Sequence, residues 1–407
     1  MAGSAPDSGS AQVADGQPQG KQTFAFIAMT CLFFFWGFIT VLNDILIPFL
    51  KESFDLNYTQ AMLVQFCFFG AYFIVSPFAG RLIDKVGYQQ GIVIGLLTTA
   101  AGCCLFYPSA SLHLYPLFLF GFFVLASGIT ILQVAANPYV AALGPEKTAA
   151  SRLNLAQAAN SFGTTVGPIV GAALILGVVA ADASAVQGPY LMIAGLLIAA
   201  ALVFRNIKLP VLTHMESEEK AEGSVWEHRH LVLGALAIFL YVGGEVSIGS
   251  FLVNYFSEST IGGLTTAEAG EMVAYYWGAA MIGRLIGAVL MNYIADTKYL
   301  AINAVIAIVM IVVSMNTSGS VAMWSILAVG FFNSIMFPTI FTLAVKGLGS
   351  MTSKGSGFVC QAIVGGALIP LVQGVAADTM GIQLSFIVPM LCYIYIGWYA
   401  LNGAQKA

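Results

Sequence analysis

Residues 23–50 read TFAFIAMTCLFFFWGFITVLNDILIPFL, and Asp44 is the only charged residue in this stretch. A helix that crosses a bilayer needs about 20 apolar residues, so the stretch predicts a membrane-spanning helix that contains a carboxyl group. On insertion scales a charge at the bilayer centre costs about 2.5–3.5 kcal/mol, and intramembrane acids usually serve a function. Asp44 is therefore the first candidate functional residue.

The rest of the chain repeats this apolar pattern. Of its 407 residues, 59% are hydrophobic and 8% are charged, whereas soluble domains contain about 25% charged residues. The apolar runs are continuous, which favours helices over the alternating pattern of a membrane β-barrel. Twelve runs predict the transmembrane helices of an all-α integral membrane protein: 23–50, 58–80, 90–110, 114–142, 151–178, 187–204, 231–256, 267–291, 299–316, 320–345, 355–376 and 381–402.

Lys and Arg residues are distributed unevenly between the predicted loops. If the N-terminus is cytoplasmic, thirteen of them fall on the cytoplasmic side, Lys51 falls on the opposite side, and Arg284 lies inside a span. Cytoplasmic loops of membrane proteins contain an excess of Lys and Arg, so we expect both termini in the cytoplasm.

The two halves of the chain look like distant copies of each other. Pro138 and Pro338 lie 200 positions apart, and each follows a span amide, Gln133 or Asn333, by five residues. Such a parallel repeat is typical of secondary transporters, which bind substrate near the bilayer midplane between the repeats. Together with the composition of the tail and the charged stretch at the centre, the repeat predicts the following organisation: a disordered tail (1–21), a six-helix bundle (22–204), a cytoplasmic linker (205–230), a second six-helix bundle (231–402) and a C-terminal tail (403–407).

The fifth span carries a stripe of polar side chains. Asn154, Gln157, Ser161 and Thr164 follow one another at spacings of three or four residues, with Asn160 at the margin. This spacing places them on one face of a helix. Hydrogen bonds between helices, worth about 0.6 kcal/mol each in membrane proteins, would explain a single amide. A stripe of this density favours a face that lines a cavity for a hydroxyl-rich ligand, because amides both donate and accept hydrogen bonds.

The fourth span places Gln133 and Asn137 one turn apart, directly before Pro138. Proline removes a helical hydrogen bond and kinks the helix, so a backbone carbonyl beside the two amides is expected to face a cavity. The alternative is a kink that serves packing alone.

Two acids lie at matching positions of the two halves. Asp44 shares a helix face with Trp36 and Thr40, and an aromatic ring above hydrogen-bonding groups suits a sugar ring. Glu245 follows Gly243-Gly244 in the seventh span, 201 positions after Asp44. Either carboxyl group could carry a proton or bind a cation, and the alternative is a structural carboxyl paired to a neighbouring helix.

Arg284 is the only basic residue predicted inside a span. Counted from the span ends at 1.5 Å per residue, it lies roughly 12 Å from Glu245 in depth. Direct pairing is therefore not expected, and extension of the side chain toward the cytoplasm is the alternative.

The turn between spans two and three reads Gly80-Arg81-Leu82-Ile83-Asp84-Lys85-Val86-Gly87, which resembles the G-x-L-x-D-x-x-G signature of the major facilitator superfamily. Four further segments are more specific and look like the fucose–galactose–glucose:proton symporter family. They are LNDILIP (42–48), AANPYV (135–140), LGPE (143–146) and RLNLAQ (152–157).

The resemblance implies two six-helix bundles, alternating access and sugar uptake across the bacterial inner membrane. It implies roles for Asp44 and for the amides Gln157 and Asn160. The family's fucose permease has a glutamate where Gln133 stands here, and an amide cannot carry a proton. This departure, together with Glu245, resembles the glucose/galactose branch and leaves both H⁺ and Na⁺ as candidate coupling ions.

The sequence thus predicts a cation-coupled symporter, driven by H⁺ or Na⁺, that imports a hexose, with glucose or galactose preferred. An L-fucose or amino-sugar symporter and a passive sugar facilitator or exporter are the alternatives. We expect no enzymatic activity, no cofactor besides the co-transported ion, no nucleic-acid partner, a monomer in the lipid bilayer, and no metal site other than one for Na⁺ near Asp44 or Glu245. The candidate residues are Trp36, Gln133, Asn137, Gln157, Asn160, Asn333 and Gln361 for substrate, Asp44 and Glu245 for cation coupling, and Gly80, Asp84, Lys85, Gly87 and Arg152 for a conformational latch.

Overall fold

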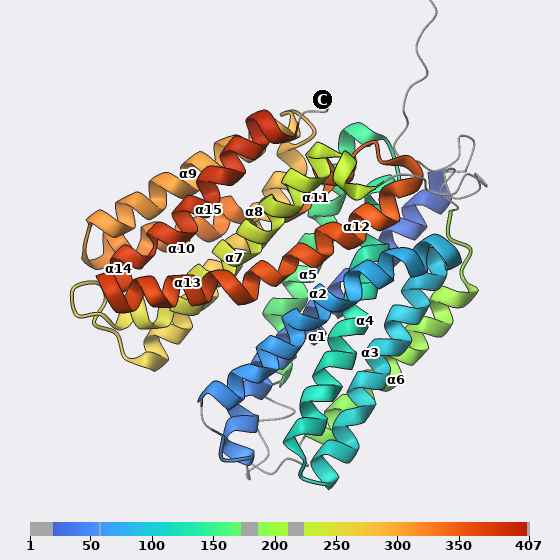
Figure 1. The fold of residues 1–407 in the computed structure, drawn as a ribbon, viewed down its shortest axis with the longest axis horizontal. Coiled ribbons are helices and arrows are strands. Elements are labelled where there is room, and N and C mark those ends of the chain that lie inside the picture. Colours follow the sequence, from blue (N-terminus) through green and yellow to red (C-terminus); the bar gives the residue numbers. More distant parts are fainter. Residues whose placement is uncertain (1–18, 57, 172–185, 211–223, 405–407) are drawn as a thin grey trace, which may run out of the picture.

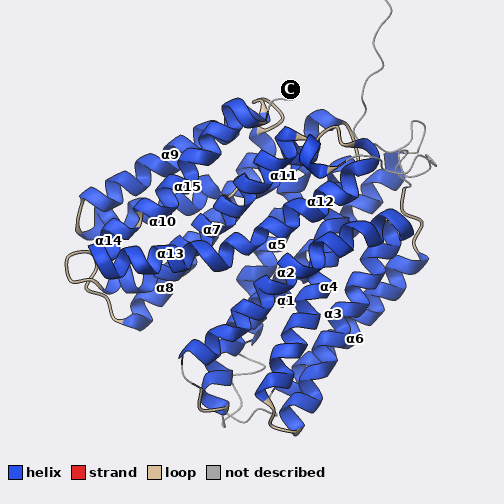
Figure 2. Cartoon of the chain, viewed as in Figure 1, coloured by secondary structure: helices blue, strands red, loops and turns tan. Residues whose placement is uncertain are grey.

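The computed structural model describes residues 19–56, 58–171, 186–210 and 224–404. These residues form helices joined by short turns, without any strand (Figure 2). Eleven of the described segments are long and apolar enough to cross a membrane, and α5 (Ala149–Gly171) lies at the place of the remaining predicted span. The all-α architecture expected from the sequence is confirmed. Most of the predicted tail (1–21) and half of the predicted linker lie outside the described residues.

The first six spans form one helical bundle, drawn from blue to green in Figure 1. Its helices are α1 (Gln19–Ser53), α2 (Tyr58–Val86), α3 (Tyr88–Ser111), α4 (Tyr115–Ala142), α5 and α6 (Gln187–Asn206). Within this bundle α3 packs on α4 and α6, and α1 runs along α5. A short 3₁₀ turn, η1 (Glu146–Thr148), joins α4 to α5.

The second bundle is drawn from yellow to red in Figure 1. Its described residues form three unbroken helices followed by three broken ones. After the turn η4 (Val225–Glu227), the unbroken helices are α7 (Arg229–Ser257), α8 (Thr266–Leu290) and α9 (Asp296–Asn316). The broken spans are α10 (Gly319–Asn333) with α11 (Met336–Val345); η5 (Gly349–Met351), α12 (Thr352–Gln361), η6 (Ala362–Val364) and α13 (Gly365–Met380); and α14 (Ile382–Ser385), α15 (Ile387–Trp398) and the π-helical turn η7 (Tyr399–Gly403).

The outer faces of both bundles carry large apolar side chains. Phe66, Val289 and Leu371 are more than half exposed, which would be unfavourable in water and is expected for helices surrounded by lipid. The inner faces contain the buried polar residues described below.

The two bundles meet most extensively along two pairs of helices, which we call the junction: α2 with α12, and α5 with α8. Figure 1 shows α2 and α12 side by side where the blue-green and yellow-red bundles meet. A Cβ atom at Gly357 of α12 would lie 2.6 Å from the carbonyl oxygen of Ser76 in α2. Glycine therefore permits the close approach of these two helices.

Candidate functional site

The sequence placed residues 80–87 in a turn, but α2 continues to Val86, and its last two turns pack directly on the second bundle. A Cβ atom at Gly80 would lie 2.9 Å from the carbonyl oxygen of Ser353. The Asp84 carboxyl group lies beside Ser353 and Lys354, and the Ser353 hydroxyl donates to the Tyr88 hydroxyl at 3.3 Å. The structure thus places the latch candidates Gly80 and Asp84 at the junction.

The other three latch candidates lie beside this contact, within the first bundle. Lys85 is exposed, and Gly87 has a φ of 85°, a backbone conformation that favours glycine. Arg152 donates to the carbonyl oxygens of Val140 and Pro145. These bonds tie the start of α5 to the end of α4, so Arg152 acts on the bundle that contains it.

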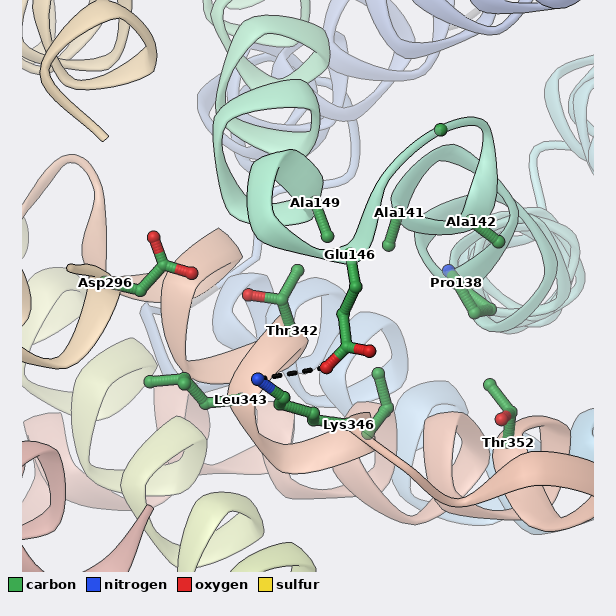
Figure 3. Close-up of a pocket in the computed structure, with 12 residues that line it drawn as sticks. Pro138, Ala141, Ala142, Glu146, Ala149, Asp296, Thr342, Leu343, Lys346 and Thr352 are labelled. Carbon is green, nitrogen blue, oxygen red and sulfur yellow. Dashed lines mark ion pairs between the residues drawn. The ribbon is translucent and has the colours of Figure 1, made fainter. Parts of the chain in front are cut away.

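An ion pair joins the bundles at the same end of the molecule (Figure 3). Glu146 of η1 and Lys346, directly after α11, lie 2.9 Å apart, and their side chains are 36% and 52% exposed. They line one pocket together with Asp296 and Thr342. Glu146 and Lys346 are 200 positions apart, the same offset as the two prolines. Residues at equivalent positions of the two repeats, with opposite charges, therefore face each other across the junction.

Pro138 lies inside α4 without interrupting it. Because proline has no N–H group, the carbonyl of residue i−4, Val134, lacks its usual helical donor. The Ser356 hydroxyl of α12 donates to this carbonyl at 2.9 Å. The first half of the repeat thus uses its freed carbonyl to bind the other bundle.

Pro338 is the equivalent residue of the second repeat. The span that contains it is broken between α10 and α11. The carbonyl freed by this proline belongs to Ser334, and it accepts a hydrogen bond from Nε of Arg284 at 3.1 Å. An intramembrane arginine therefore supplies the donor that the proline removed.

The two span-four amides are buried and incompletely bonded. Gln133 donates to the Tyr72 hydroxyl at 2.7 Å, while its Oε1 atom has no partner among the described residues. Asn137 is fully buried, and neither atom of its amide group has such a partner. Leaving a buried polar group without a hydrogen bond costs about 1–3 kcal/mol. Such groups call for an explanation, and a bound ligand or water supplies one.

The second bundle contains a counterpart of the Gln133–Tyr72 pair. The Asn333 amide nitrogen donates to the hydroxyls of Tyr276 at 2.7 Å and Tyr393 at 3.0 Å. Its Oδ1 atom has no partner in the described part of the chain. An amide bonded to a tyrosine of the second helix of the repeat is therefore found in both halves.

The polar stripe of α5 faces the second bundle. Asn154 Nδ2 lies 3.1 Å from the sulfur of Met291, and the Ser161 hydroxyl accepts a hydrogen bond from Arg284. Gln157 lies one turn before Ser161 and is buried. Asn160, at the margin of the stripe, instead donates to the carbonyl of Phe33 in α1 at 3.0 Å.

The remaining candidates lie on α1 and at the end of α12. Trp36 is 7% exposed, and its ring packs against Phe33 with centroids 5.2 Å apart. Gln361 is half-buried where α12 passes into η6. Asp44 lies within α1, but its side chain is outside the described part of the structure.

Glu245 and Arg284 form an ion pair, which corrects the expectation from the sequence. Arg284 Nη2 lies 3.9 Å from Glu245 Oε1, and their side chains are 12% and 13% exposed. The Tyr241 hydroxyl donates to the same carboxylate oxygen at 2.7 Å. The depth estimate compared the positions of the two backbones and left out the combined reach of the two side chains, whose end atoms lie 3.9 Å apart. The guanidinium group thus contacts Glu245 and Ser334 in its own bundle and Ser161 in the other.

Comparison with known proteins agrees with this architecture. The sequence profile described as "Major Facilitator Superfamily" matches residues 25–370. The chain belongs to the major facilitator superfamily. It is 57% identical to the "Glucose/galactose transporter" of Brucella abortus biovar 1 (strain 9-941), over 95% of this chain and 96% of the relative. It is 35% identical to the "L-fucose-proton symporter" of Escherichia coli (strain K12), over 94% and 93%.

A solved structure shows the same two-bundle layout. The superfamily transporter FucP, in a crystal structure of its outward conformation, matches with a TM-score of 0.88 and 34% identity over 95% of this chain and 100% of that one. The expected resemblance to the fucose–galactose–glucose:proton symporter family is confirmed, as is the major facilitator fold with two six-helix bundles.

Several contacts of this superfamily member were not expected from the sequence. The tyrosines that bond the span amides were missed, although Tyr72 and Tyr276 lie 204 positions apart, close to the repeat offset. The pair Glu146–Lys346 was also missed, and the 200-position offset was a signal that would have found it.

Proposed function

We propose that this protein is a cation-coupled symporter that imports a hexose, with glucose or galactose as the preferred substrate. The names of the two relatives support sugar transport for this fold, and the 57% identity favours the glucose/galactose branch. The sugar is bound between the bundles, near mid-membrane. L-fucose, an amino sugar and uncoupled transport are the alternatives that the experiment below separates.

The observation that carries the proposal is the pair of buried, incompletely bonded amides. Among the described residues, Asn137 has two polar atoms without a partner and Gln133 has one, and both lie on α4 beside the contact with α12. A hexose has several hydroxyl groups, and each can donate to an amide oxygen and accept from an amide nitrogen. Binding of a sugar would therefore satisfy groups that the protein leaves unpaired. Gln157, Asn333, Gln361, Asn160 and Trp36 are the further residues proposed for the sugar site.

We propose that the end of the molecule that contains Asp84, Glu146 and Lys346 faces the cytoplasm. The helix ends and connections at this end carry Arg81, Lys85, Lys147, Lys298 and Lys346, and an excess of Lys and Arg marks the cytoplasmic side. A transporter closed at its cytoplasmic end is open to the outside, which agrees with the outward conformation of the matching FucP structure. We propose a monomer in the bacterial inner membrane with both termini in the cytoplasm.

Coupling requires that the cation bind one conformation better than the other. Glu245 already faces the positive charge of Arg284 in the state described here. We therefore assign the coupling ion to Asp44 in α1 and retain Glu245 as the second candidate. H⁺ and Na⁺ are both suitable, because a carboxylate near amides and carbonyls can take up either ion.

Sugar uptake into proteoliposomes tests this function. The purified full-length protein is reconstituted, and accumulation of radiolabelled D-glucose, D-galactose and L-fucose is measured under an imposed pH gradient, a sodium gradient or neither. We expect glucose or galactose to accumulate above the external concentration with one gradient only. Uptake that never exceeds equilibration under either gradient would contradict symport and favour a facilitator.

A further inference from the structure

The contact between Arg284 of α8 and Ser161 of α5 lies where the described hydrogen bonds between these two helices end. Along α5, side chains that bond to α8 begin at Ser151, whose hydroxyl donates to the carbonyl of Ala288, and end at Ser161. Ser161 lies ten positions after Ser151, which is about 15 Å along the helix. No described residue of α5 beyond Ser161 has a hydrogen bond to the second bundle. Counted from the start of α5, the Arg284–Ser161 contact is therefore the last hydrogen bond between this helix and the second bundle among the described residues.

A substrate that enters from the outside, opposite the end that contains Ser151, reaches the Arg284–Ser161 contact first. Arg284 and Glu245 are not sealed, since their side chains keep 12% and 13% exposure. Gln157 lies one turn from Ser161, and its backbone carbonyl accepts a hydrogen bond from the Ser161 hydroxyl at 3.1 Å. The guanidinium group thus lies where α5, with its proposed sugar-binding amide, faces the second bundle.

The guanidinium group has donors to spare. Arginine carries five N–H groups and cannot lose its charge in a protein. Hydrogen bonds to the Ser334 carbonyl and the Ser161 hydroxyl, together with the ion-pair contact to Glu245, use at most three of the five. The two contacts in its own bundle fix the orientation of the group, because the Glu245 carboxylate is itself bonded by Tyr241.

The partner across the junction is a hydroxyl group. The Ser161 hydroxyl accepts from Arg284 and donates to the carbonyl of Gln157, so both of its hydrogen-bonding functions are used. A sugar hydroxyl has the same donor and acceptor pattern. Ser161 therefore presents to Arg284 the same chemical group that a hexose would present.

Resting on the proposed function, we propose that Arg284 is a substrate-binding residue that donates a hydrogen bond to a hydroxyl group of the hexose. Ser161 holds the guanidinium group in place before sugar binds and gives it up, wholly or in part, when sugar arrives. Glu245 and the Ser334 carbonyl are positioning groups that keep the guanidinium group aimed across the junction. The second bundle thereby contributes a charged donor to a site whose other proposed polar groups are amides.

Equilibrium binding tests the inference without any ion gradient. Binding of radiolabelled D-glucose and D-galactose to the full-length protein in nanodiscs is measured for the wild type, Arg284→Lys, Ser161→Ala and a matched control, Ser325→Ala. Ser325 is a buried serine that bonds only carbonyls of its own helix. A panel of monodeoxy hexoses, each lacking one hydroxyl group, is used as competitors.

We expect Arg284→Lys to weaken hexose binding about 10- to 100-fold, the range for a hydrogen bond to a charged group. Ser161→Ala should leave binding unchanged or tighter, because it removes a competitor for the guanidinium group. One monodeoxy hexose, the analogue that lacks the hydroxyl group bound by Arg284, should bind the wild type weakly and bind Arg284→Lys with the same affinity. If Arg284→Lys does not fold, the charge-balanced double variant Glu245→Gln with Arg284→Gln replaces it.

The inference is overturned if Arg284→Lys binds hexose within twofold of the wild type, or if Ser161→Ala weakens binding as much as Arg284→Lys does. It is also overturned if Arg284→Lys and the wild type show the same loss of affinity, relative to the parent hexose, for every deoxy analogue. That result would indicate a structural role for Arg284. A wild type that binds no hexose contradicts the proposed function as well, so the two failures are distinguishable.

Discussion

The two bundles share one scaffold but differ in the polar groups that they bury. Gln133 bonded to Tyr72 in the first half corresponds to Asn333 bonded to Tyr276 in the second. Beyond this pair the halves diverge. The first bundle adds Asn137, neither of whose amide atoms has a partner among the described residues, whereas the second adds the ion pair of Glu245 with Arg284.

The difference extends to the prolines that the repeat has in common. Pro138 leaves α4 continuous, and the freed Val134 carbonyl bonds the other bundle. Pro338 lies beside a helix break, and the carbonyl freed there is bonded by Arg284. The duplicated scaffold thus carries two kinds of polar group: the first half presents neutral amides for a sugar, and the second half adds the ion pair of Arg284 with Glu245 to its own amides.

The largest expected effect concerns the charges of the second bundle. Glu245→Gln or Arg284→Gln alone leaves an uncompensated charge in a largely buried site, which typically costs about 3–5 kcal/mol. We expect both single variants to unfold at clearly lower temperature in detergent, and the double variant to recover most of the loss. A double variant as unstable as the sum of the single ones would show that the ion pair does not hold the two charges.

The amide of the first bundle should behave in the opposite way. Asn137→Leu removes two unpaired polar atoms, so stability should stay the same or rise by up to about 1–3 kcal/mol, while hexose binding falls about tenfold or more. Thermal unfolding and equilibrium binding are measured together. Asn303→Leu is the control, because the buried Asn303 amide bonds its own helix at Tyr299. Unchanged sugar binding in Asn137→Leu would remove Asn137 from the site.

The close packing between the bundles can be tested on one helix. Gly80→Val places a side chain against Ser353, and overpacking typically costs about 1–3 kcal/mol. Gly70 lies on the same helix, and a Cβ atom there would have no neighbour within 4 Å among the described residues, so Gly70→Val is the matched control. We expect the initial uptake rate of Gly80→Val to fall about tenfold and that of the control to stay within about twofold. Equal loss in both variants would indicate a general effect on the helix.

The smallest effect is expected at the pair Glu146–Lys346. Exposed ion pairs contribute about 0.2–1 kcal/mol, so Glu146→Lys or Lys346→Glu should change the uptake rate about twofold, and the charge swap should restore it. High salt should suppress the difference, since exposed charges are screened. A swap variant no better than the single reversals would show that the two residues act independently.

The sequence was sufficient for the fold and for the order of the spans. Continuous apolar runs located the helices, and the offset between Pro138 and Pro338 revealed the two bundles. The breaks in the last three spans were not predicted, because Gln361 and Gly365 lie in an apolar stretch whose pattern does not distinguish an α-helical turn from a 3₁₀ turn.

The site was predicted less completely, for a physical reason. Helical spacing shows which side chains share a face, so it grouped Gln157 with Ser161. It does not fix how far two side chains on neighbouring helices reach toward each other, and the pairing of Arg284 with Glu245 depends on that reach. The role of Asp44 rests on the sequence and on the family resemblance alone.

The central claim is that an intramembrane carboxyl group couples an ion to sugar movement, and Asp44→Asn in proteoliposomes tests it most directly. Gradient-driven accumulation of the transported hexose and counterflow exchange are measured on the same preparation, with Glu245→Gln beside it. The account predicts that Asp44→Asn loses accumulation and retains counterflow, while Glu245→Gln lowers accumulation and counterflow together, because Glu245 positions Arg284 for sugar binding. Accumulation by Asp44→Asn at the wild-type level would contradict the account.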